Sequence, residues 1–184
     1  MALRIKSQWH DEDAERSMQE IAGALAFNGW KIAMNQAINL HGQRFIYEND
    51  RQRLAVIAEY LIFEIQLVER LTHDTLDMDQ RRTLITTLAL RLADTLDENS
   101  HDLLGPGDYR SDFIERLNQQ SSEYAGFKFT RDGPSYPFTR HFGFQVQQLM
   151  GDGQENRWVI DQIMDKDAPE VYKQFKRIIR NLFD

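Results

Sequence analysis

The scarcity of chain breakers is the feature that most constrains the fold of this chain. Its 184 residues include only ten Gly and four Pro, mostly clustered. A sandwich of many short strands needs a turn roughly every 8–12 residues, so the long stretches without breakers favour helices. The hydrophobic share of 41% and the charged share of 28% are near those of globular proteins. We therefore expect one helical domain over residues 1–184.

The first long helix is predicted to begin near Asp11 or Asp13 and to run to about Leu40, because apolar residues recur there at steps of three and four. A strip of small residues lies on it and would let a neighbouring backbone approach closely. This strip consists of Gly29, Ala33 and Ala37. A break of the helix at Gly29 is the alternative interpretation.

The second helix is predicted to start after Asn49 or Asp50, either of which can cap it, and to end near His73. It holds the most apolar window of the chain, residues 54–68. Polar side chains interrupt that window at Glu59, Glu64 and Gln66. We therefore expect a central core helix and no membrane span. Steps of five residues rotate successive glutamates by about 140°, so Glu59, Glu64 and Glu69 cannot all point inward.

The third helix is predicted to open at Asp77 and Gln80, which have the spacing of a capping box, and to end near Glu98. Shorter helices should follow, with a small hairpin near 127–136 as a further possibility. These helices are expected over about 109–125 after a cap at Asp108 or Ser111, over 137–150, over 158–164, and from a cap at Asp167 to the end.

These patterns together predict an all-α fold, a bundle of about six to seven helices. Three long N-terminal helices joined by short turns should run up, down and up. The shorter C-terminal helices should then pack on them.

Composition excludes several classes of function. The chain has no cysteine, which excludes disulfides, thiolate metal sites and a cysteine nucleophile. Its formal net charge of −7 argues against unaided, non-specific binding of nucleic acid. The N-terminus lacks the apolar run of a secretory signal. We expect a cytoplasmic protein.

The histidines do not form a recognisable metal or catalytic pattern. His41, His73 and His101 fall at predicted helix ends, where capping explains them. A two-metal carboxylate centre needs Glu-x-x-His on two helices, and the chain has one such run, Glu98 to His101. Signatures of a serine nucleophile or a phosphate-binding loop are also missing. The sequence therefore predicts no metal site, no cofactor and no catalytic residue.

The stretch from Tyr109 to Phe144 combines aromatic and basic residues with a loop rich in glycine and proline. Irregular loops on a rigid scaffold often carry function, and aromatics with arginine are common in partner-binding sites. The candidate ligand- or partner-binding residues are Tyr109, Arg110, Arg131, Tyr136, Arg140 and His141. The alternative is that the aromatics close one end of the bundle while the cations are solvated.

The last helix carries a second candidate feature, a cationic face formed by Lys173, Lys176, Arg177 and Arg180. The helix dipole favours cations near a C-terminus and is sufficient to explain them. The alternative is a docking strip for an acidic partner or a membrane surface.

The function predicted from these observations is a non-enzymatic helical interaction or adaptor module that binds a protein partner and could form homo-oligomers. One alternative is a small-molecule binder in which Arg110, Arg140 or His141 holds an anionic group. A less favoured alternative is an enzyme that depends on a metal or uses His141 as a general base.

Overall fold

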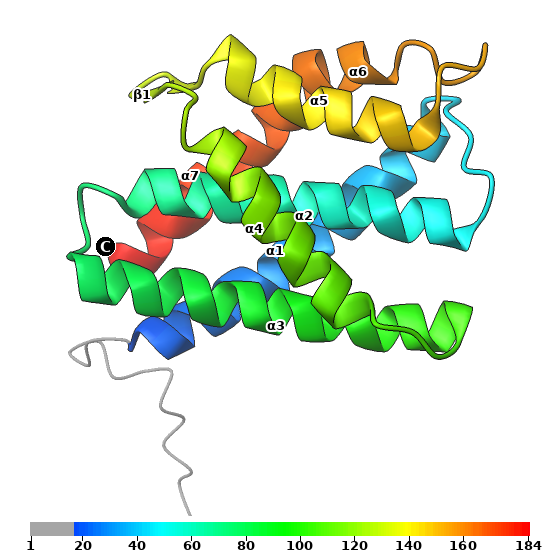
Figure 1. The fold of residues 1–184 in the computed structure, drawn as a ribbon. Helices are drawn as coiled ribbons and strands as arrows, with labels where there is room; N and C mark the ends of the chain where they lie inside the picture. The colour runs from blue at the N-terminus through cyan, green and yellow to red at the C-terminus, as the bar shows by residue number, and fades with distance from the viewer. Residues whose placement is uncertain (1–16) are drawn as a thin grey trace, which may run out of the picture.

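The computed structural model describes residues 17–184 and is an all-α helical bundle (Figure 1). The elements in chain order are α1 (Met18–Gly42), α2 (Asp50–Thr72), α3 (Met78–Leu104), α4 (Tyr109–Tyr124), β1 (Phe129–Thr130), β2 (Gly133–Pro134), α5 (Tyr136–Met150), α6 (Val159–Gln162), the π-helix η2 (Ile163–Asp167) and α7 (Ala168–Phe183). The two strands pair antiparallel, with Phe129 opposite Pro134, which is the small hairpin predicted.

The helix α2 lies at the centre of the bundle. It packs against α1, α3, α4, α5 and α7, and every residue from Val56 to Val68 is buried. The helices α1, α2 and α3 run up, down and up, and α4 crosses in front of α2 and α3 (Figure 1). The predicted central helix and the predicted topology of the three long helices are therefore confirmed.

The helix α1 is continuous through Gly29. Ser17 caps it in a reciprocal capping box with Glu20. The start predicted near Asp11 or Asp13 lies outside the described residues. Gly29, Ala33 and Ala37 are all buried, so the small-residue strip faces the core, and the atoms nearest to Gly29 belong to the side chains of Glu64 and Phe175.

The caps of α2 and α3 are also confirmed, since Asn49 accepts from the backbone N–H of Gln52 and Asp77 forms the expected box with Gln80. The predicted end of α3 near Glu98 was wrong, because the helix continues to Leu104. No helix breaker intervenes before Gly105, whose φ of 81° ends the helix.

Two predicted caps in the C-terminal half were wrong. Asp108 makes no side-chain cap for α4. Asp167 does not restart a helix, because its backbone is helical and η2 continues directly into α7. Its carboxylate lies in the core instead, where it accepts hydrogen bonds from Tyr60 (2.5 Å) and Gln162 (3.0 Å).

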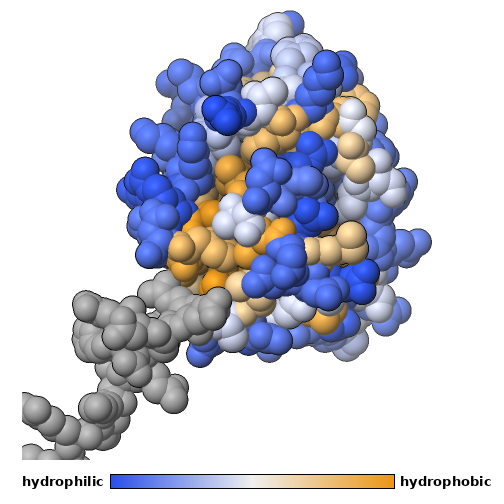
Figure 2. Space-filling view, turned by 90° about the vertical axis from the view of Figure 1, so that its left-hand side faces the viewer, coloured by the Kyte–Doolittle hydropathy of each residue, from blue (hydrophilic) through white to orange (hydrophobic). Residues whose placement is uncertain are grey.

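Aromatic side chains hold α5 against α2. Phe63 stacks on Phe142 with ring centroids 4.3 Å apart and meets Phe138 edge-on, while Tyr124 of α4 also packs on Phe138. The space-filling view of the end at which α7 terminates shows hydrophobic side chains in the middle of that face (Figure 2). Among the described residues, no helix combines the length and hydrophobicity that crossing a bilayer requires.

Candidate functional site

A groove of about 810 Å³ lies between α2, α3 and α4. It forms because α4 crosses α3 near the turn that joins them and then diverges from it, leaving α2 as the floor (Figure 1). We call it the α3/α4 groove. Its lining residues are Ile65, Gln66, Glu69, Arg70, His73, Asp74, Ile85, Thr86, Ala89, Leu90, Ile114, Leu117, Asn118, Ser121, Ala125 and Phe129.

The two walls of the α3/α4 groove carry no charged residue. The wall from α3 consists of Ile85, Thr86, Ala89 and Leu90, and the wall from α4 consists of Ile114, Leu117, Asn118, Ser121 and Ala125. Leu90 is 39% exposed, so part of this apolar surface faces solvent. The opposite face of α4 is acidic, so only the side of that helix that faces the groove is uncharged.

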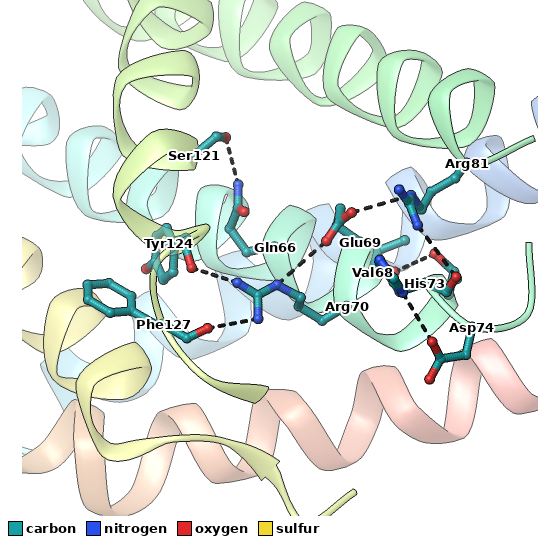
Figure 3. A network of polar contacts seen from close by, with 11 residues as sticks. Gln66, Val68, Glu69, Arg70, His73, Asp74, Arg81, Ser121, Tyr124 and Phe127 are labelled. Atoms are coloured by element: carbon teal, nitrogen blue, oxygen red, sulfur yellow. Dashed lines mark hydrogen bonds and ion pairs between the residues drawn. The ribbon is translucent and has the colours of Figure 1, made fainter. Parts of the chain in front are cut away.

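Charged groups are confined to one end of the groove, where α2 and α4 both terminate (Figure 3). Arg70 donates to the carbonyl oxygens of Tyr124 (2.6 Å) and Phe127 (2.9 Å). Tyr124 is the last residue of α4 and Phe127 follows it, and the Tyr124 carbonyl also accepts from the Phe127 backbone N–H at 3.0 Å. Arg70 therefore fixes the end of α4 on α2, and Gln66 adds a hydrogen bond to Ser121 (2.8 Å).

A second arginine completes this charged end. Arg81 of α3 lies 3.4 Å from the Glu69 carboxylate and donates to the carbonyl of His73 (Figure 3). The His73 ring in turn lies 3.1 Å from Asp74. These contacts join the start of α3 to the end of α2, so all three helices that line the groove are held at this end.

The opposite face of α4 borders a smaller groove of about 430 Å³. Its lining is polar and consists of Asp112, Glu115, Arg116, Gln119, Gln120, Glu123 and Gln145. Beneath it lies a buried network. The Glu59 carboxylate contacts Arg116 and accepts from Gln120 Nε2 at 3.0 Å for each oxygen.

The network continues to His141. Since Gln120 turns its nitrogen to Glu59, its oxygen is left to accept from His141 Nε2, 3.2 Å away. The neutral imidazole therefore carries its proton on Nε2, and a second proton would add at Nδ1, 3.3 Å from Glu123. Burial lowers the pKa of His141, and the Glu123 carboxylate opposes that shift. Burial likewise raises the pKa of Glu59, against Arg116 and Gln120.

The six predicted site residues do not gather at one place. Tyr109 and Arg110 lie at the α3–α4 turn, where Tyr109 donates to Gly105 and Arg110 pairs with Asp94 at 2.6 Å. The hairpin and the start of α5 lie at the other end of α4 (Figure 1). The remaining four residues belong to that second region.

In that region Arg131 is exposed in the hairpin turn and Tyr136 is 69% exposed at the start of α5. Arg140 is exposed too, with its guanidinium 5.9 Å from the Phe144 ring. His141 is buried in the network with Gln120. None of the six predicted residues lines the α3/α4 groove.

Within residues 17–184, no three or more His, Asp or Glu side chains are grouped as a metal site would need. His101 lies in the last turn of α3, as predicted, but its ring donates to the Asp97 carbonyl one turn back within the helix and does not cap the helix end. Searches of protein-family models, curated proteins and solved structures find no match to this chain.

The sequence reasoning missed the α3/α4 groove. The signal that could have found it is the run of uncharged residues at helical spacing on α4, which includes Ile114, Asn118, Ser121 and Ala125. Apart from Ile114, these residues are small or polar and do not resemble a core stripe. Only the position of α3 turns them into one wall of a groove.

Proposed function

We propose that this protein is a non-enzymatic interaction module whose α3/α4 groove binds an amphipathic helix of a protein partner. The observation that carries the proposal is the pair of facing, uncharged helix walls with α2 as their floor. A helix that binds in such a groove inserts apolar side chains from positions i, i+3 or i+4, and i+7. We expect the module to act in the cytoplasm, and the absence of cysteine is compatible with that reducing compartment.

The length of the groove suits this ligand. The α4 wall extends from Ile114 to Ala125, about 16 Å at 1.5 Å per residue. A partner helix of about three turns covers that length. Leu90 would lose its exposure to water on binding, while Thr86 and Asn118 offer hydrogen bonds at the edges.

An anionic small molecule is less well supported as the ligand. Arg70 is the one arginine of the lining, and its two terminal nitrogens already donate to backbone carbonyls. The volume of about 810 Å³ is nevertheless within the range of small-molecule sites. A bound metabolite is therefore a measurable outcome of the test.

The test is site-specific photocrosslinking in cells. A benzophenone amino acid replaces Asn118 in the groove or, as the control, Leu103, which is exposed on α3 outside it. We expect crosslinks from Asn118 to one partner segment with apolar residues at helical spacing. Leu90→Arg should abolish that crosslink, whereas Leu103→Arg should leave it unchanged.

Two results would overturn the proposal. One is a crosslink from Asn118 that survives Leu90→Arg or maps to a segment without helical periodicity. The other is native mass spectrometry that finds a small molecule bound to the wild type and lost in Leu90→Arg, which would assign the groove to that ligand. Circular dichroism of both arginine variants confirms that each remains folded.

A further inference from the structure

The helix α7 separates its apolar and cationic residues completely. It buries Val171, Phe175 and Ile179 and exposes Lys173, Lys176, Arg177 and Arg180. No acidic residue occurs between Glu170 and Asp184. The helix dipole accounts for cations in the last turn, but its effect has faded at Lys173, in the second turn of the helix.

The hairpin brings two more cations to the same surface. Its Phe129 ring lies 6.0 Å from the Tyr172 ring of α7. Its Gly133 lies so close that a Cβ there would be 2.7 Å from Tyr172 Cε1. Lys176 reaches over the same ring, with its nitrogen 5.8 Å from the centroid. Tyr172 is therefore where the hairpin and α7 meet.

Lys128 and Arg131 are exposed, next to Phe129 and in the hairpin turn. We use the name basic face for the exposed cations of these two segments. The basic face consists of Lys128, Arg131, Lys173, Lys176, Arg177 and Arg180. Segments about forty residues apart in the chain thus contribute cations to one surface of a protein whose net charge is −7.

Ion pairing differs between the basic face and the centre of the bundle. On α2, α3 and α4, five of the eight arginines lie within ion-pair distance of a carboxylate, namely Arg53, Arg70, Arg81, Arg110 and Arg116. Among residues 17–184, no such pair includes a member of the basic face. The nearest carboxylates in the sequence are those of Asp132, Glu170 and Asp184, and the six cations of the basic face outnumber them.

We propose that the basic face binds the anionic surface of a lipid bilayer. The basic face itself is formed by α7 and the hairpin. No residue of α7 lines either of the two grooves described above. Exposed Tyr136 follows the hairpin, and tyrosine favours the membrane interface. The helix α7 ends on the side of the molecule that Figure 2 shows, where hydrophobic side chains gather, and its last apolar residues, Leu182 and Phe183, are half-buried. Clustered cations beside such residues are typical of interfacial binding.

Sedimentation with vesicles tests this proposal. The full chain is mixed with vesicles of phosphatidylcholine alone or with phosphatidylserine added. We expect sedimentation only with the anionic vesicles, and release at about 1 M salt, where charges are screened within about 3 Å. Lys176→Glu with Arg177→Glu should weaken the apparent affinity by roughly tenfold or more.

The matched control is Arg51→Glu with Arg82→Glu, which changes the net charge equally at exposed sites outside the basic face. This control should bind the anionic vesicles as the wild type does, apart from a small effect of net charge. An equal loss in both double variants would overturn the proposal, as would no binding at low salt. Binding to polyglutamate or single-stranded DNA without binding to vesicles would also overturn it and assign the basic face to a polyanion.

Discussion

Glu59 and Glu64 are two buried carboxyl groups of the same helix with opposite surroundings. Glu59 faces α4, where Arg116 and Gln120 satisfy it. Glu64 faces α1, where its carboxyl lies against Gly29, and the Phe175 ring of α7 lies close to the same glycine. Within the described part of the chain, neither oxygen of Glu64 has a hydrogen-bond partner.

This difference shows that burial of a carboxyl group has one of two effects, depending on whether hydrogen-bond donors surround it. A buried carboxylate with several donors orients the helices that supply them, so Glu59 links α2 to α4 and, through Gln120, to α5. A buried carboxyl without donors is forced to keep its proton, and burial raises the pKa of Glu64 well above its usual value. We therefore expect Glu59 to stabilise the fold and Glu64 to weaken it at neutral pH.

The largest expected effect follows removal of the Gln120 amide, which donates to Glu59 and accepts from His141. Gln120→Leu deprives Glu59 of two hydrogen bonds and leaves His141 Nε2 buried without its acceptor. We expect the free energy of unfolding in urea to fall by about 3 kcal/mol. Gln119→Leu, at the neighbouring exposed position, is the control and should change it by less than about 0.5 kcal/mol. Equal effects of the two variants would show that the network does not stabilise the protein.

The next largest effect should have the opposite sign. Glu64→Met replaces the unpartnered carboxyl with an apolar side chain of similar length, so no buried oxygen remains unpaired. We expect the free energy of unfolding at pH 7.5 to rise by about 2 kcal/mol. A decrease would mean that Glu64 has a favourable interaction in the folded state, and the contrast with Glu59 would fail.

The pH dependence of unfolding provides a separate readout of Glu64. Below the unfolded-state pKa of about 4.3, the carboxyl keeps its proton in both states. Above it the unfolded state ionises first, because burial raises the folded-state pKa. The contribution of Glu64 to stability is thus lost as pH rises from about 4.3 to the folded-state pKa. Glu64→Gln, which cannot ionise, should flatten this decline relative to the wild type.

The fold was largely predictable from the sequence. Apolar spacing identified the central helix α2, and the caps at Asn49 and Asp77 were read directly from residue type. Asp167 was misread because aspartate before Ala-Pro-Glu is typical of a helix start. Nothing local reveals that Tyr60, 107 residues earlier, binds its carboxylate instead.

The candidate site was less predictable because it depends on the angle between helices. Arg131, Tyr136 and Arg140 were chosen for their residue types, yet they lie away from the α3/α4 groove. The groove exists because α4 diverges from α3, and no residue pattern predicts the angle between these two helices. Helix geometry correctly predicted that Glu59, Glu64 and Glu69 cannot all point inward. Glu59 and Glu64 are buried, while the Glu69 side chain is 31% exposed.

The smallest expected effect tests whether Glu64 is held firmly against α1. A Cβ at Gly29 would lie 2.8 Å from Glu64 Oε2, closer than van der Waals contact allows. Alanine gains about 1 kcal/mol in helix propensity, but the overlap should cost more, so Gly29→Ala should lower the free energy of unfolding by about 1 kcal/mol. With Glu64→Val also present, the same change should become stabilising.

The matched control for this pair is Gly23→Ala on the same helix. A Cβ at Gly23 would meet the guanidinium of Arg91, an exposed side chain that can move away. Gly23→Ala should therefore show the full gain in helix propensity and raise the free energy of unfolding by about 0.5–1 kcal/mol. If Gly29→Ala stabilised the protein as much as Gly23→Ala does, the Glu64 carboxyl would have room to move. Loose packing around the Glu64 carboxyl would then explain why it has no hydrogen-bond partner, and α1 and α7 would not hold it in a fixed position.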